Sequence, residues 1–176
     1  MSRALFLDRD GVINARPMGD YVKNRSELVI LPSFLAAVPQ IFPAFSRVVV
    51  VTNQQGIAKG VMSEADLAGI HDAIADAVTA AGGKIDGFFY CPHLTDAFCE
   101  CRKPQVGLAL QAKNRFPDID FSRSMMVGDT ASDLTFARRL GMRAVWMETA
   151  EEAVPDRALF DQKICTLDDL LKDASR

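Results

Sequence analysis

Four consecutive valines, Val48 to Val51, are the feature that most constrains the fold of this chain. A strand in which every residue is apolar has both faces covered, and such strands belong to the parallel sheets of α/β proteins. We therefore predict a buried parallel strand over residues 47–52. Since 49% of the 176 residues are apolar, the chain can form one hydrophobic core, and we expect a single domain over residues 1–176.

Strand-like and helix-like segments alternate along the rest of the chain. Strands are predicted at 4–7, 47–52, 86–90, 124–127, 144–147 and 163–165, and helices at 63–81, 106–116, 131–140 and 167–172. The first of these helices has a capping pair at Ser63 and Asp66 and ends before Gly82. Such alternation favours βαβ crossovers, so we expect a three-layer, doubly wound α/β fold with a mostly parallel sheet.

Composition excludes several classes of partner. A net charge of −3 without a basic cluster argues against nucleic acid, and no apolar run approaches the length of a membrane span. Because the first predicted strand starts at residue 4, we expect no signal peptide. We therefore expect a cytoplasmic monomer whose four cysteines are thiols or metal ligands.

Asp8 and Asp10 directly follow the first predicted strand, and Gly11 follows them. Alternate residues of a strand point the same way, so the two carboxylates can converge as the chain leaves the sheet. Convergent carboxylates suit Mg²⁺, which offsets their mutual repulsion. An Asp-Gly turn with one solvated aspartate is the structural alternative.

Polar residues also end the other predicted strands. In chain order they are Thr52, Asn53 and Gln54 after the second strand, Lys103 after the third, and Asp129 and Asp133 after the fourth. Ligands of α/β sheets bind at the carboxyl ends of strands, so we expect these groups to form one site. Each residue has an ordinary structural explanation, and for Asp133 it is a capping box with Thr130.

Three cysteines and one histidine lie between residues 91 and 101. Cys91, His93, Cys99 and Cys101 supply a complete tetrahedral ligand set for a structural Zn²⁺ ion. Buried or redox-active thiols are the alternative.

Two further residues with reactive side chains stand outside these motifs. We expect Cys165 to be a small core residue. We expect His71 to be structural or exposed rather than catalytic.

The ordered set of motifs resembles the haloacid dehalogenase (HAD) superfamily of phosphohydrolases. That superfamily has DxD after the first strand, Thr or Ser after the second, a later lysine and an acidic pair after the fourth. The matching residues here are Asp8-Arg9-Asp10-Gly11, Thr52, Lys103, Asp129 and Asp133. The resemblance covers nearly the whole chain and implies a Rossmann-like phosphatase core.

The resemblance also implies roles for the three aspartates nearest the phosphate. Asp8 would attack phosphorus and form an aspartyl-phosphate, and Asp10 would act as general acid and then as general base. A Mg²⁺ ion would be held by Asp8, Asp129 and the backbone carbonyl of Asp10.

The remaining motif residues would support phosphate binding. Thr52 and Lys103 would hold the phosphate oxygens, and Asp133 would orient Asp129 or a metal-bound water. Because Cys101 directly precedes Arg102 and Lys103, a zinc loop would fix the backbone that carries the lysine. Arg102 is a candidate to bind a second anionic group, or else an exposed loop arginine.

The site is expected to be open and capless. Roughly forty residues separate the first two motifs, too few for a cap domain, so loops would contact the substrate. The candidate contacts are Asp20 and Tyr21 within the loop 18–22, then Asn53, Gln54 and Gln55, and finally Arg102 and Lys103.

Two capless groups with this zinc motif are similar to the chain. Segments 10–14, 52–60 and 86–93 resemble phosphatases of heptose 1,7-bisphosphate, whereas the five residues between His93 and Cys99 resemble histidinol-phosphate phosphatases. Gln105 and Thr130 depart from the heptose pattern, which has proline-glycine-methionine and a lysine at these places. We expect the heptose bisphosphate as substrate, with histidinol phosphate or another small phosphate monoester as the alternative.

Non-enzymatic classes share part of the same chemistry. Receiver domains of response regulators combine clustered aspartates, Mg²⁺, a threonine and a lysine on a parallel sheet, and a catalytically idle relative could sense sugar phosphates. The zinc loop and the second acidic pair argue for a turning-over phosphatase.

Overall fold

Every strand of the sheet runs parallel to its neighbours. The computed structural model describes residues 2–17, 19–150 and 152–173. Within these residues the sheet consists of β1 (Ala4–Leu7), β2 (Arg47–Asn53), β3 (Gly87–Cys91), β4 (Met125–Gly128), β5 (Arg143–Met147) and β6 (Gln162–Ile164). Their order is β3-β2-β1-β4-β5-β6, so the strand order reverses beside β1. A doubly wound sheet binds its ligands at the carboxyl end of this switch point.

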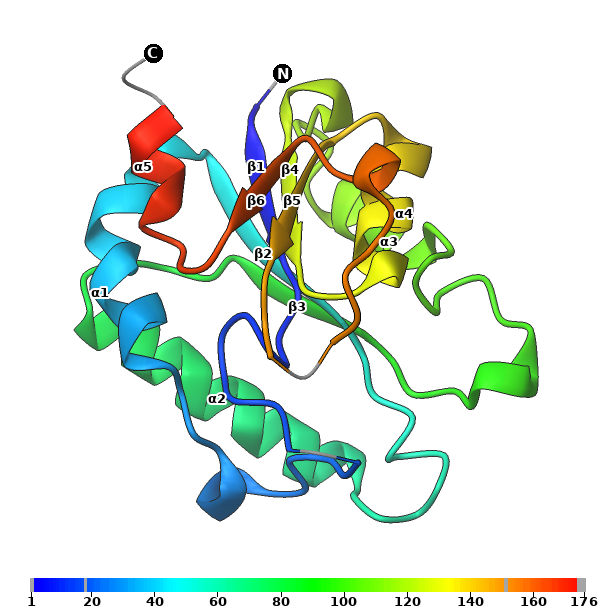
Figure 1. Ribbon diagram of the computed structural model, residues 1–176. Helices are drawn as coiled ribbons and strands as arrows, with labels where there is room; N and C mark the ends of the chain where they lie inside the picture. Colours follow the sequence, from blue (N-terminus) through cyan, green and yellow to red (C-terminus); the bar gives the residue numbers. More distant parts are fainter. Residues whose placement is uncertain (1, 18, 151, 174–176) are drawn as a thin grey trace.

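Helices cover both faces of the sheet (Figure 1). The α-helices are α1 (Pro32–Ile41), α2 (Glu64–Ala80), α3 (Gly107–Arg115), α4 (Ala131–Leu140) and α5 (Asp169–Asp173). Short 3₁₀ turns are η1 (Arg25–Glu27), η2 (Phe42–Ala44), η3 (Thr95–Ala97), η4 (Phe121–Arg123) and η5 (Arg157–Leu159). Leu5 and Leu7 pack in the same core as α1 and α2, whereas Ala4 and Phe6 pack with α3 and α4. The predicted three-layer fold is confirmed.

The valine run forms the expected central strand. Val48 and Val50 face the α1–α2 core, and Val49 and Val51 face the α3–α4 core. Strand β2 pairs with β1 on one side and with β3 on the other. Both faces and both edges of β2 are therefore covered, as its apolar sequence requires.

Helix α2 begins as predicted, and helix α1 was missed. The Ser63 hydroxyl accepts from the backbone N–H of Asp66 at 3.1 Å, and the Asp66 carboxylate accepts from the backbone N–H of Ser63 at 2.9 Å. Helix α1 has no side-chain cap at Leu31 and contains both Pro32 and Pro39. Pro32 stands in the first turn, where prolines are tolerated, but Pro39 interrupts the pattern by which a helix is recognised.

The expectation for Cys165 was wrong. Its side chain is exposed, and its Sγ lies 3.6 Å from a carboxylate oxygen of Glu148. His71, in contrast, is buried and stacks on Phe88 with ring centroids 4.4 Å apart. Burial and the nearby Arg9 lower the pKa of His71 to about 3, so it is a neutral, structural imidazole.

Loops border the carboxyl edge of the sheet. Between the end of β1 and the start of α1, and between β2 and α2, the described residues form turns and one 3₁₀ segment without an inserted domain. The predicted capless arrangement is confirmed. In the part of the chain that the structure describes, no helix is long and apolar enough to cross a membrane.

Candidate active site

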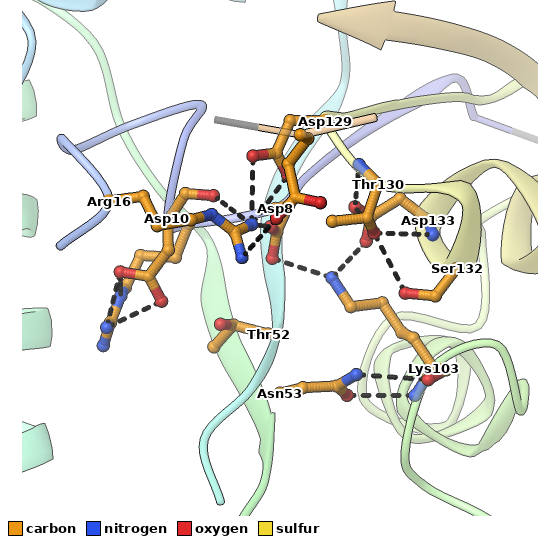
Figure 2. Close-up of polar contacts among 12 residues, drawn as sticks. Asp8, Asp10, Arg16, Thr52, Asn53, Lys103, Asp129, Thr130, Ser132 and Asp133 are labelled. Carbon is orange, nitrogen blue, oxygen red and sulfur yellow. Dashed lines mark hydrogen bonds and ion pairs between the residues drawn. The ribbon is translucent and has the colours of Figure 1, made fainter. Parts of the chain in front are cut away.

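Asp8, Thr52, Lys103 and Asp129 meet at the carboxyl edge of β1, β2 and β4 (Figure 2). The backbone N–H of Asp8 donates to the carbonyl of Val127 at 3.0 Å, which holds the residue beside β4. All four side chains are buried. Strand ends far apart in the sequence thus supply one constellation, as the motif pattern predicts.

Lys103 is a buried ammonium surrounded by acceptors. Its Nζ lies 2.7 Å from Asp8 Oδ1, 2.6 Å from Asp133 Oδ1 and 2.7 Å from the carbonyl of Val51. Burial lowers the pKa of Lys103, but the carboxylates of Asp133 and Asp8 raise it above the ordinary value. Asn53 fixes the lysine backbone by donating to its carbonyl at 3.1 Å and accepting from its N–H at 3.0 Å.

Asp133 has two functions in the structure. Its Oδ2 accepts from the Thr130 hydroxyl at 2.6 Å and from the Thr130 backbone N–H at 3.1 Å, which completes the capping box of α4. Its Oδ1 binds Lys103. The carboxylate therefore orients the lysine, whereas the sequence had suggested Asp129 or a metal-bound water as its partner. Gly128 allows this approach, because a Cβ there would lie 2.2 Å from Asp133 Cβ.

Asp10 is held as a carboxylate by a set of donors. Arg9, which is fully buried, donates from Nη2 to both carboxylate oxygens at 2.8 Å, and Asn14 and Gln54 each donate at 2.9 Å. Burial alone would raise the pKa of Asp10, but Arg9 and these hydrogen bonds lower it. Gln54 also donates to the Thr52 hydroxyl at 2.8 Å, so it links two predicted catalytic residues.

Arg16 lies where the predicted Mg²⁺ ligands converge. Its Nη2 is 3.0 Å from the Asp10 carbonyl, 2.8 and 3.0 Å from the two Asp129 carboxylate oxygens, and 3.8 Å from Asp8 Oδ2. We call these oxygens of Asp8, Asp10 and Asp129 the cation cradle. Two carboxylates and a carbonyl are the hard donors that Mg²⁺ prefers, so the cradle fits the predicted ion. Nothing in the sequence distinguished Arg16 from a solvated loop arginine.

The cradle strongly perturbs its acids. Burial, followed by repulsion from Asp8 and Asp133, raises the pKa of Asp129 to about 8, although Arg16 opposes this shift. Burial also raises the pKa of Asp8 to about 6, against the lowering effect of Lys103. A cation bound in the cradle would favour the charged forms of both acids.

A cavity of about 220 Å³ opens in front of these groups. Its lining includes the predicted substrate contacts Asp20, Tyr21, Asn53, Gln55, Arg102 and Lys103, together with Asp8, Asp10, Arg16, Pro17, Thr52, Thr130, Ser132 and Asp133. Gln54 does not line it, because the side chain is buried behind Thr52 and Asp10. Asp129 lies behind Arg16 at the back of the cradle.

Hydrogen bonds connect the loops at the rim of the cavity. The Tyr21 hydroxyl accepts from Gln55 at 2.8 Å and from Lys59 at 2.9 Å, and Thr95 of the cysteine loop donates to Gln55 at 3.1 Å. We call the chain Lys59–Tyr21–Gln55–Thr95 the rim network. It joins the loop between β1 and α1, the loop between β2 and α2, and the cysteine loop, which is the segment 91–101.

The four predicted zinc ligands form a compact cluster. The Cys91 Sγ lies 3.1 Å from Cys101 Sγ and 3.5 Å from Cys99 Sγ, and His93 Nδ1 lies 3.2 Å from Cys101 Sγ. Ligands about 2.3 Å from a tetrahedral Zn²⁺ ion stand about 3.8 Å apart, so a small expansion of the cluster would admit the metal. Arg102 donates to the His93 carbonyl at 3.4 Å, which ties the loop to the cavity.

This combination of fold and site resembles that of phosphatases of the haloacid dehalogenase type. A family model described as HAD-hydrolase-like matches residues 100–172. The D-glycero-α-D-manno-heptose-1,7-bisphosphate 7-phosphatase of Mycobacterium tuberculosis is 43% identical over 140 residues, which cover 80% of this chain and 74% of that protein. The corresponding β-anomer phosphatase of Pseudomonas aeruginosa is 38% identical over 152 residues, covering 86% and 84%.

A solved structure extends the similarity to three dimensions. The D,D-heptose 1,7-bisphosphate phosphatase of B. bronchiseptica, complexed with magnesium and phosphate, superimposes with a TM-score of 0.85 at 32% identity, covering 97% of this chain and 99% of that one. The chain belongs to the haloacid dehalogenase family and is a phosphatase, as its motifs predict.

Gly11 provides a test of the cradle geometry. Its φ is +91°, and a Cβ there would lie 2.1 Å from Asp129 Oδ2. Gly11→Ala should destabilise the fold by about 1–3 kcal/mol more than Gly141→Ala, because Gly141 also has a positive φ (+68°) but has open space at its Cβ. Urea unfolding of both variants measures the difference, and equal losses would contradict a tight Gly11–Asp129 contact.

The cysteine cluster should contain about one Zn²⁺ per chain after purification under reducing conditions. Cys99→Ser should remove the metal and lower both the melting temperature and the turnover, because the same backbone carries Lys103. The exposed Cys165 gives the control, and Cys165→Ser should leave zinc content and stability unchanged. Elemental analysis that finds no zinc in the wild-type protein would exclude the metal loop.

Proposed function

We propose that the protein is a Mg²⁺-dependent phosphomonoesterase that acts through an aspartyl-phosphate on Asp8. The position of Asp8 carries this proposal. Asp8 Oδ1 is 2.7 Å from the Lys103 ammonium, Asp8 Oδ2 is part of the cation cradle and lies 3.8 Å from Arg16 Nη2, and the residue lines the cavity. With the Lys103 ammonium on one side and a cation in the cradle on the other, the Asp8 carboxylate can approach an anionic phosphate, because the two positive charges offset the repulsion between carboxylate and phosphate.

The surrounding residues fit both halves of such a reaction. Asp8 would form a bond to phosphorus as the bond to the substrate oxygen breaks, and water would later release phosphate and regenerate the carboxylate. Lys103 and the Thr52 hydroxyl would stabilise the phosphoryl oxygens, since Thr52 accepts from Gln54 and keeps its own proton to donate. Bound Mg²⁺ would neutralise charge on the carboxylates and the phosphate.

Asp10 has the position of the acid–base group. It lines the cavity and stands two residues after the nucleophile. The donors around it favour the ionised form, which suits the activation of water in the second half-reaction. In the first half-reaction, Asp10 must carry the proton that it gives to the leaving alcohol. To do so, its carboxyl group must give up part of its contact with Arg9, Asn14 and Gln54.

The substrate that we propose is D-glycero-D-manno-heptose 1,7-bisphosphate, with loss of its 7-phosphate. The named activity of the relatives supports it, as does the pairing of Lys103 and Arg102 in one cavity, which offers a second cation for a second phosphate. Histidinol phosphate is the second candidate, because the short spacing between His93 and Cys99 resembles enzymes of that group. Thiol ligands also suit a reducing compartment, so we infer action in the cytoplasm on a small phosphorylated metabolite.

Asp8→Asn should abolish turnover and preserve the fold. The amide cannot act as a carboxylate nucleophile, yet it has nearly the same shape and removes one negative charge from a buried acidic cluster. We expect kcat to fall to background while the melting temperature stays equal or rises. Asp72→Asn, on the exposed face of α2, serves as the control and should retain full activity. Substantial kcat in Asp8→Asn would exclude the covalent mechanism.

Arg102→Ala tests the proposed bisphosphate. Loss of the guanidinium should cost about 1.5–3 kcal/mol in kcat/KM for heptose bisphosphate, the range for one charge-assisted hydrogen bond. A small generic monoester should lose far less. For histidinol phosphate, whose far end is cationic, the change should be neutral or favourable.

Arg139→Ala provides the matched control for Arg102. Arg139 donates to the Pro104 carbonyl at 3.1 Å and to Gln105 at 2.8 Å, so it supports the same loop without lining the cavity. Its removal should affect all three substrates alike. If Arg102→Ala shows the same uniform loss, Arg102 only supports the loop and the bisphosphate assignment fails.

A further inference from the structure

Arg16 spans the cation cradle and the protein surface. At its inner end, Nη2 contacts the oxygens of Asp10 and Asp129 (Figure 2). At its outer end, Nη1 lies 3.2 Å from a carboxylate oxygen of Glu152. Its side chain is 27% exposed, and its Nε is buried without a hydrogen-bond partner. The guanidinium therefore fills the cradle but leaves one of its own donors unsatisfied.

The cradle requires a positive charge whether or not metal is bound. The carboxylates of Asp8, Asp129 and Asp133 have oxygen atoms within 4.8 Å of one another, and all three residues are buried. Lys103 neutralises the side formed by Asp8 and Asp133. Arg16 supplies the charge on the Asp129 side, and a guanidinium is always protonated in proteins.

The same oxygens cannot serve Arg16 and Mg²⁺ together. Magnesium binds its ligands at about 2.0–2.1 Å, whereas Nη2 lies 2.8–3.0 Å from the oxygens of Asp10 and Asp129. An ion at the focus of those oxygens would lie well inside the contact distance of Nη2. Two cations at such a separation also repel each other strongly.

We propose that Arg16 is the resident cation of the metal-free enzyme and that Mg²⁺ must displace it to bind. This inference rests on the metal site of the proposed function and adds a competitor to it. Arg16 then has opposite effects on the two states: it stabilises the metal-free fold and weakens the apparent affinity for the ion. Nε has no hydrogen-bond partner in this position of the side chain. The guanidinium can therefore move toward Glu152 and the cavity without losing a hydrogen bond from Nε.

The displacement should also reach the substrate loop. Arg16 and Pro17 line the cavity together with Asp20 and Tyr21, which follow on the same loop. A guanidinium released from the cradle remains on this loop, so its positive charge stays beside the entering phosphate. Metal binding would thus transfer one positive charge from the back of the site to its entrance.

Titration calorimetry with Mg²⁺ alone tests the proposal. The enzyme is first freed of Mg²⁺ by mild chelation that leaves the cysteine cluster intact. Arg16→Ala should bind Mg²⁺ about tenfold more tightly than the wild-type protein, equivalent to ~1.4 kcal/mol. In EDTA its melting temperature should be lower than that of the wild type, and saturating Mg²⁺ should remove most of this difference.

Arg138→Ala is the matched control. Arg138 has a 37% exposed side chain and lies 2.8 Å from Asp161, outside the cradle, so its loss should leave the Mg²⁺ affinity unchanged. Arg16→Gln, which is neutral but polar, should reproduce the tighter binding if the alanine variant folds poorly. A variant that folds only when Mg²⁺ is present would also support the proposal, because the cradle would then lack its resident cation.

Two results would overturn the inference in distinguishable ways. Equal or weaker Mg²⁺ affinity in both Arg16 variants, with an unchanged melting temperature in EDTA, would refute the competition and leave the metal site intact. Absence of Mg²⁺ binding in the wild-type protein and in every variant would refute the metal site itself and the inference with it.

Discussion

Negative charge buried at one edge of the sheet is the constraint on which the remaining structure depends. Asp8 and Asp10 follow β1, Asp129 follows β4, and Asp133 lies in the first turn of α4. Carboxylates held close together in a buried site repel one another. Three basic side chains compensate this negative charge. Lys103 lies between Asp8 and Asp133, Arg9 grips Asp10, and Arg16 contacts Asp129. Each of the four acids therefore has a basic side chain within ion-pair distance.

Close approach of the backbone makes this arrangement possible. Gly11 and Gly128 stand beside Asp129 and Asp133, and a side chain at either position would collide with a carboxylate or its Cβ. The parallel sheet brings the strand ends into register. Gly11 lets Asp129 approach the end of β1, and Gly128 lets Asp133 of α4 approach the end of β4. The same packing of the two apolar cores against the sheet that stabilises the fold therefore also sets the distances between the charged groups of the site.

The parts of this structure that follow from local, repeating patterns were predictable from sequence. Apolar strands with both faces covered and amphipathic helices bounded by caps predicted the sheet, four of its helices and the ordered set of Asp8, Thr52, Lys103 and Asp129. Helix α1 escaped because Pro39 breaks the helical signal while tertiary packing of Phe34 and Val38 sustains the helix. The exposure of Cys165 could not be inferred, because one residue after a short edge strand carries no periodicity.

Long-range partnerships were the other part that sequence could not supply. The contact of Arg16 with Asp129 joins residues 113 positions apart, and no motif marks the arginine. Gln54 was expected at the substrate, but its side chain turns inward to Thr52 and Asp10. In both cases the side chain could satisfy its hydrogen bonds in more than one direction, and only the surrounding fold decides between them.

The rim network has a consequence for how molecules enter the site. Many enzymes enclose a substrate by closing a domain over it, so their entrance changes width in each cycle. Here Tyr21, Gln55 and Thr95 hold three loops together through side-chain hydrogen bonds, and no inserted domain stands above the described residues. The width of the opening therefore depends on the hydrogen bonds of the rim network and not on the position of a separate domain. A phosphorylated end that fits about 220 Å³ can enter, while the remainder of a larger molecule stays outside in water.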